Sequence, residues 1–68
     1  MKHTTVEWCQ EANTWDVVAW TVDAEQALRK IGYGDIVENG KCLFPFSERQ
    51  SALRVSKEIN EVLERDNA

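Results

Sequence analysis

The amino-acid sequence predicts a small α+β domain spanning residues 1–68, in which two helices cover one face of an antiparallel sheet. Three observations lead to this fold class. An apolar stripe at helical spacing runs through residues 47–66, two segments rich in Thr, Val and Trp lie near the N-terminus, and Asn39-Gly40 separates two short apolar runs. The expected order is strand, strand, helix, strand, strand, helix. Both helices are expected on the same sheet face, because each has one apolar side that must be buried against another element.

The C-terminal segment, residues 47–66, is predicted to be the longer helix. Ser47 and Gln50 have the spacing of a capping box, in which a hydroxyl and an amide satisfy free backbone N–H groups. Apolar or small residues recur every three or four positions: Ala52, Val55, Ser56, Ile59, Val62 and Leu63. The stripe is expected to face a core, since the run is shorter than the roughly three or four heptads that indicate a coiled coil.

The N-terminal segments Thr4–Glu11 and Thr14–Val22 are predicted to form a hairpin around Ala12-Asn13. A two-residue loop places Trp8 opposite Val17, and Val6 and Trp8 then share a face with Trp15, Val17 and Ala19. A three-residue loop puts them with Val18, Trp20 and Val22 instead, because a one-residue slip exchanges the two faces. We predict the three-residue loop, since it gathers the larger apolar set.

A short helix is predicted after this hairpin. Asp23 is its expected N-cap, Gly32 its expected end, and Arg29 and Lys30 lie in the last turn, where positive charge complements the helix dipole. Its apolar side consists of Ala24, Ala27, Leu28 and Ile31. Tyr33-Gly34 is the expected connector to the second hairpin.

The segment Asp35–Phe46 is predicted to be a second hairpin, because Asn-Gly is the preferred pair for a tight type I′ turn. A two-residue loop pairs Val37 with Cys42 and Ile36 with Leu43. Pro45 cannot donate to a ladder, which indicates a sheet edge or a strand end. The segment Asp35–Glu38 is either a fourth strand or an extension of the turn, which would leave three strands.

In the predicted registers, the face away from the helices is unusually apolar. A large exposed apolar patch commonly marks an interaction site. The predicted partner-binding residues on or beside this face are Glu7, Trp15, Asp16, Val17, Ala19, Ile36 and Leu43. The alternatives are a different register, or N-terminal residues that fold over the patch.

The formal net charge of −4 lies entirely in the first 25 residues, where five acids meet only Lys2; the remaining residues hold seven acids and seven bases. An acidic surface with tryptophan suits a basic protein partner. We therefore predict a non-enzymatic protein-binding module. It would inhibit or regulate a nucleic-acid-binding protein, with carboxylates in place of phosphates, or self-associate as a homodimer. Short acidic chains of this kind are often accessory proteins of phages and other mobile elements.

Direct nucleic-acid binding is the alternative hypothesis. Aromatic side chains would stack on bases, and Arg49, Arg54 and Lys57 would contact phosphates. The aromatic candidates are Trp15, Trp20, Tyr33 and Phe44. The acidic balance makes this hypothesis the weaker one, because nucleic-acid binding needs a basic surface.

No catalytic, cofactor or metal motif is recognisable in the sequence. His3, Cys9 and Cys42 are too dispersed for the close ligand pairs of structural zinc, and the cysteines are expected to be thiols that pack as small apolar groups. No apolar run approaches the roughly 18 residues of a membrane span. The first residues lack the apolar centre of a secretory signal, so a cytoplasmic location is expected.

Overall fold

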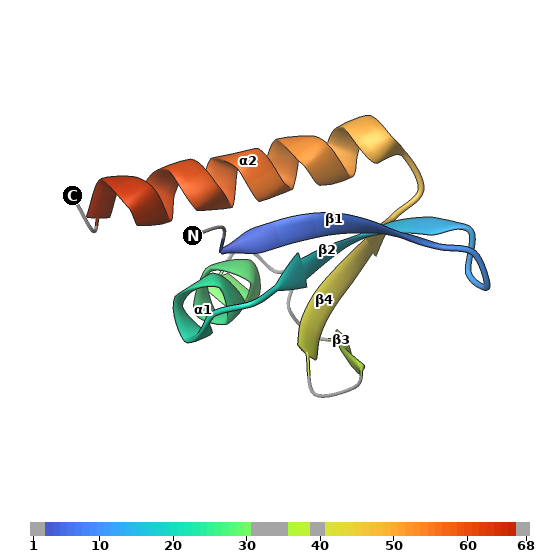
Figure 1. Cartoon of the computed structure of the whole chain (residues 1–68), viewed down its shortest axis with the longest axis horizontal. Coiled ribbons are helices and arrows are strands. Elements are labelled where there is room, and N and C mark those ends of the chain that lie inside the picture. Colours follow the sequence, from blue (N-terminus) through green and yellow to red (C-terminus); the bar gives the residue numbers. More distant parts are fainter. Residues whose placement is uncertain (1–2, 31–35, 39–40, 67–68) are drawn as a thin grey trace.

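Four strands form one antiparallel sheet with two helices on one of its faces (Figure 1). The computed structural model describes residues 3–30, 36–38 and 41–66. The elements in chain order are β1 (Thr4–Cys9), β2 (Thr14–Ala19), α1 (Val22–Lys30), β3 (Ile36–Glu38), β4 (Lys41–Phe46) and α2 (Arg49–Asp66). The strands lie in the order β1-β2-β4-β3. The predicted α+β class, element order and position of both helices are confirmed.

The predicted register of the first hairpin is wrong. Val6 lies opposite Val17 and Trp8 opposite Trp15. Residues 10–13 connect the strands, and Asn13 takes a φ of 55°, a left-handed conformation that asparagine tolerates better than most residues. A loop of four residues instead of three moves every β2 side chain to the other face relative to β1. The same residues share each face as in the two-residue alternative. Each β1 residue, however, pairs with a β2 residue two positions nearer the loop, so Trp8 is opposite Trp15 and not Val17.

The core lies between one sheet face and the two helices. Its buried members come from β2, β4 and both helices: Val17, Ala19, Ala24, Leu28, Cys42, Ala52 and Ile59. Trp15 is partly buried against the same cluster. Trp15, Val17 and Ala19 therefore belong to the helix-covered face and not to the open one. The prediction failed because the hairpin was judged by its own apolar content, whereas the small Ala19 and Ala52 let the helices pack closely on this face.

Helix α1 begins two residues earlier than the predicted Asp23 cap implies. Thr21 is the N-cap: its Oγ1 accepts from the backbone N of Ala24 at 3.1 Å, and its carbonyl accepts from the N of Glu25 at 3.0 Å. Asp23 lies in the first turn instead. Ala24 and Leu28 are buried, as the apolar side predicts. Ile31, Gly32 and Tyr33-Gly34 lie outside the described residues.

Helix α2 begins at Arg49, one residue later than the predicted Ser47 cap requires. The carbonyl of Glu48 accepts from the backbone N of Ala52 at 3.3 Å, so Glu48 occupies the N-cap position. The buried positions of the helix follow the predicted stripe except at Val62, which is 49% exposed. Val62 lies at the margin of the stripe, facing the groove beside α1.

The second hairpin has the predicted pairing. Val37 lies opposite Cys42 and Ile36 opposite Leu43, so β3 is a short fourth strand. The predicted turn at Asn39-Gly40 lies outside the described residues. Pro45 stands opposite Asp16 of β2, past the last β4 residue that β3 reaches. Within the described residues no strand lies beside Pro45 on the side away from β2, which agrees with the predicted sheet edge or strand end.

A buried polar cluster fastens β1 to α2. The backbone N of Thr4 donates to Oδ1 of Asn60 at 2.8 Å, and Nδ2 of Asn60 donates to the Thr4 carbonyl at 3.3 Å. The Thr4 and Ser56 hydroxyls are 2.7 Å apart. Thr4 is only 1% exposed, so these bonds replace water that cannot reach it.

We predict that Asn60→Ala lowers the free energy of unfolding by about 1–3 kcal/mol, because it leaves the buried Thr4 main chain without its partners. Urea unfolding followed by far-UV circular dichroism measures the change. The control is Glu64→Ala on the exposed side of α2, which should stay within about 0.5 kcal/mol of the parent. Equal losses in the two variants would show that Asn60 does not anchor β1.

Candidate functional site

The predicted open-face patch does not form as one surface, because the corrected register divides its residues. Trp15, Val17 and Ala19 lie on the helix-covered face. Glu7, Asp16 and Leu43 lie on the opposite face, where Glu7 is directly across from Asp16. The backbone of Ile36 is paired with Leu43, but its side chain lies outside the described set.

The open face is less accessible to a partner than the sequence predicted. Its described strand residues are Thr5, Glu7, Cys9, Thr14, Asp16, Val18, Leu43 and Pro45. Val18 is 3% exposed and Leu43 9% exposed, so their apolar atoms offer little contact area. Trp20 follows β2, and its Nε1 donates to the hydroxyl of Thr5 at 2.6 Å.

The most exposed aromatic side chain among the described residues, Trp8, lies on the helix-covered face at the end of the first hairpin. Trp8, Trp15 and Phe46 come from β1, β2 and β4 and occupy directly paired positions, and we call them the aromatic row. The rings of Trp8 and Trp15 have centroids 4.8 Å apart and are tilted by 51°. Trp8 is 49% exposed, whereas Trp15 is half-buried. The row therefore ends in a tryptophan that is supported on one side and open on the other.

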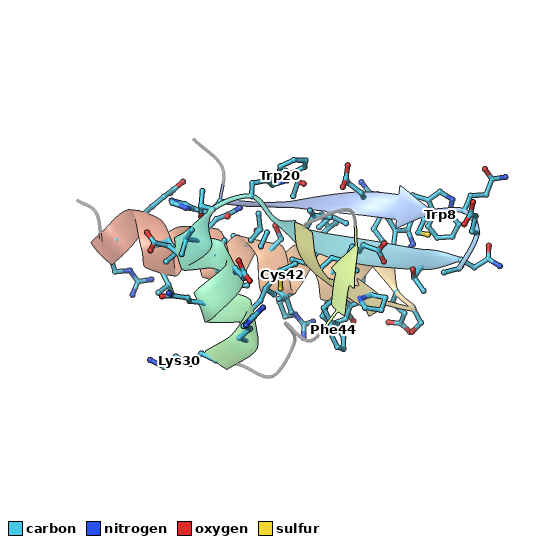
Figure 2. The ribbon with its side chains drawn as sticks, turned by 90° about the horizontal axis from the view of Figure 1, so that it is seen from below. Trp8, Trp20, Lys30, Cys42 and Phe44 are labelled. Atoms are coloured by element: carbon cyan, nitrogen blue, oxygen red, sulfur yellow. The ribbon has the colours of Figure 1, made fainter. Side chains whose placement is uncertain are left out.

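This exposure follows from the shape of the hairpin. The loop end of the hairpin extends past the start of α2 (Figure 1), and we call residues Glu7–Asp16 the projecting hairpin. Trp8 lies at this end, whereas Trp20 lies near the opposite end of β1 (Figure 2). The helix that covers Val17 therefore does not cover Trp8.

The projecting hairpin is strongly acidic. It contains Glu7, Glu11 and Asp16 and no Lys or Arg, a net charge of −3 out of −4 for the whole chain. Asp16 is 8% exposed and accepts a 2.8 Å hydrogen bond from the Thr14 hydroxyl. Glu7 is exposed and stands directly opposite Asp16, and like charges in opposed positions destabilise a sheet. An incoming cation would relieve that repulsion.

The three basic residues predicted to contact nucleic acid are all exposed on α2, and Arg49 lies over an aromatic ring. The Arg49 guanidinium carbon lies 5.6 Å from the centre of the Trp15 ring. Lys57 lies 4.0 Å from Glu61, and Arg54 is exposed. Among the aromatic candidates, Trp20 lies at the other end of β1 and Tyr33 is outside the described residues. Phe44 is on the same face as Trp15, with its ring centroid 5.1 Å from that of Phe46.

A shallow groove of about 200 Å³ separates the two helices. Ala27, Ile59 and Val62 form its apolar floor, and Lys30 and Glu58 stand at its sides. The exposed Val62 makes it a second accessible apolar site. With one positive and one negative side chain in its lining, the groove has no preference for the sign of a ligand.

Within the described part of the chain, no three His, Cys, Asp or Glu side chains are grouped to hold a metal ion. The two cysteines lie on opposite faces of the sheet, so they do not pair with each other: Cys42 is buried and Cys9 is half-buried. Nδ1 of His3 lies 3.0 Å from the Thr21 hydroxyl. None of the described helices could cross a membrane.

Sequence reasoning missed Trp8 and Phe46 as members of an accessible site and Asn60 as an anchor. Trp8 was assigned to the face of Val18, which followed from the wrong register. The signal for Asn60 was present, since it follows Ser56 by four positions and so places a second polar group on the buried side of α2. Two such groups indicate a buried hydrogen-bonded contact.

Comparison of this chain with protein-family models, with curated proteins and with solved structures finds no match. The case for a function therefore depends on the geometry of the chain itself.

We predict that Trp8→Leu removes the exciton couplet of the indole band in circular dichroism, because two indoles at 4.8 Å couple their transitions. Loss of the ring contact should also lower stability by about 0.5–1.5 kcal/mol beyond the lost burial. Trp20→Phe is the control, and it should keep the couplet. A couplet that survives in Trp8→Leu would mean that Trp8 does not lie opposite Trp15.

Proposed function

We propose that this chain is a non-enzymatic protein-binding module whose projecting hairpin docks on a basic surface of another protein. The observation that carries the proposal is Trp8, which is half-exposed and in ring contact with Trp15 at the end of a hairpin with a net charge of −3. The earlier hypothesis of docking through the open sheet face is replaced by docking through the hairpin end.

Trp8 has the properties of an interface anchor. Tryptophan is enriched among the few residues that dominate binding energy, because it buries a large area with few rotatable bonds. Contact with Trp15 restrains the indole before a partner arrives. A restrained side chain loses less entropy on binding, so more of its burial appears as affinity.

The charge of the hairpin selects the class of partner. Glu7 and Glu11 are exposed, and the projecting hairpin has no base to neutralise them. Complementary charge speeds association and excludes acidic partners. A protein that binds nucleic acid has a surface of the required sign, and carboxylates would then occupy positions suited to phosphates. Inhibition or regulation of such a protein is the activity that we propose.

Single-stranded nucleic-acid binding is the second candidate, and Arg49 is the observation that favours it. Its guanidinium lies over Trp15, beside the exposed ring of Trp8, so a base and a phosphate could be contacted together. The acidic hairpin opposes this function, because a phosphate backbone would approach Glu7 and Glu11.

The docking proposal is tested by comparing hairpin variants with matched controls on a partner purified from the native host. Trp8→Ala should weaken binding at least about tenfold, or about 1.4 kcal/mol, whereas Trp20→Ala should not. Glu11→Lys should weaken binding more than Glu64→Lys, although both change the net charge equally. Calorimetric titration gives these affinities. Equal effects of hairpin and control variants would contradict the proposal.

The second candidate predicts a different result with a short single-stranded oligonucleotide. Tryptophan fluorescence should then report binding that weakens steeply with salt and is lost in Arg49→Glu. The docking proposal expects no such binding at low salt. Salt-sensitive binding that is lost in Arg49→Glu would replace protein docking with nucleic-acid binding.

A further inference from the structure

Among the described strands, β1 is at the edge of the sheet, since β2 is its only neighbour there. The backbone N of Trp20 donates to the His3 carbonyl at 2.9 Å, so the main-chain groups of His3 face β2. Those groups alternate along a strand. The N–H and C=O groups of Thr4, Val6 and Trp8 therefore face away from the sheet, along what we call the outer edge of β1.

The outer edge is occupied at one end only. Asn60 bonds both main-chain groups of Thr4, as a residue of a neighbouring strand would. Helix α2 then crosses from this edge toward β2, since Arg49 in its first turn lies over Trp15. In the described part of the chain, no side chain is placed against the main chain of Val6 or Trp8 as Asn60 is against Thr4. The loop end of the projecting hairpin extends past the helix at this end (Figure 1).

We infer that the outer edge of β1 at Val6 and Trp8 accepts an extended segment of the partner protein as a fifth strand, with a basic side chain beside Glu7. Added strands of this kind bind through main-chain hydrogen bonds and gain specificity from alternate side chains. The inference rests on the proposed function and adds the mode of docking and the pattern recognised.

The charge of the open face argues for a basic residue in the added strand. A side chain next to Glu7 would fall on the open face, where Glu7 and Asp16 already stand opposite each other. A Lys or Arg there would stand beside Glu7 as an opposite charge, which is a favourable cross-strand contact. The residues before and after it would fall beside Val6 and Trp8, where apolar side chains fit. The expected pattern is therefore apolar, basic, apolar.

A second copy of this chain fits the edge poorly in the two antiparallel registers centred on Glu7 and on Val6. An antiparallel pairing of two β1 strands that sets Val6 opposite Trp8 places the two Glu7 side chains face to face. A pairing of Val6 with Val6 needs the main-chain groups of Thr4, which Asn60 already occupies. These conflicts favour a different protein as the source of the strand.

The test uses the parent protein and a short blocked peptide that alternates valine and lysine. Nuclear magnetic resonance should show that exchange of the Val6 and Trp8 amide protons slows about tenfold or more when the peptide binds. The Thr5 and Glu7 amides face β2 and serve as internal controls. N-methylation of the peptide amides that face β1 should weaken binding about tenfold, because it removes the donors.

Two further arms examine the charge pattern. A peptide that alternates valine and glutamate should bind much more weakly to the parent. Glu7→Lys should reverse this preference, whereas Glu64→Lys should leave it unchanged. Strand addition would be overturned if N-methylation of the peptide left its affinity unchanged. It would also be overturned if peptide binding did not slow the exchange of the Val6 and Trp8 amide protons. Protection of these amides without peptide, with a doubled mass in light scattering, would also overturn it by showing that a second copy occupies the edge.

Failure of strand addition is distinguishable from failure of docking. If Trp8→Ala and Glu11→Lys weaken binding of the purified partner while the Val6 amide exchanges at its free rate, docking stands and strand addition is wrong. If neither substitution matters, the proposed function itself is wrong.

Discussion

The pairing of β1 with β2 decides which side chains of the sheet meet the helices. Val17 stands opposite Val6 and is fully buried in a core that also contains Leu28 and Ile59. Burial of each such side chain is worth about 1.5–3 kcal/mol, so the helices hold the hairpin in this register. A shift of one residue would bring Asp16 and Val18 under the helices and put Val17 on the open face. The position of the aromatic row follows from the same constraint, since Trp8 and Trp15 are the next pair on the same face of the hairpin.

Helix α2 crosses the sheet obliquely, and the crossing makes the two ends of β1 different. Near the C-terminal end of α2, Asn60 closes the strand edge at Thr4 with hydrogen bonds like those of a neighbouring strand. At the N-terminal end of α2, Arg49 lies over Trp15 of β2, so the part of β1 nearest the hairpin loop lies beyond the helix. An edge strand with unpaired main-chain groups is a known liability for aggregation, and an exposed charge such as Glu7 is one of the usual protections. The charge of Glu7 also favours a basic residue in any strand that pairs with the outer edge of β1.

Alternation along the projecting hairpin separates its two kinds of contact. Trp8 and Trp15 point to the helix side, whereas Glu7 and Asp16 point to the open side. A partner that approached either face alone would meet only aromatic rings or only carboxylates. One that approached the edge of β1 would meet both, with the main chain between them. The edge is therefore the place where the apolar and acidic features of this chain can act on a single ligand.

The amino-acid sequence by itself determined the element order, the placement of both helices on one face and the pairing of β3 with β4, because local periodicity and the turn preference of the Asn-Gly dipeptide predict them. It also located the acidic half of the chain. Only the tertiary structure decided the first register, because neither the length of the loop at Asn13 nor the small residues that admit the helices has a periodic signal. The site depended on that register, so Trp15 was predicted on the wrong face and Trp8 was overlooked. Contacts between distant segments, such as Thr4 with Asn60, arise only when the chain is packed, since nothing in the local sequence of either residue identifies its partner.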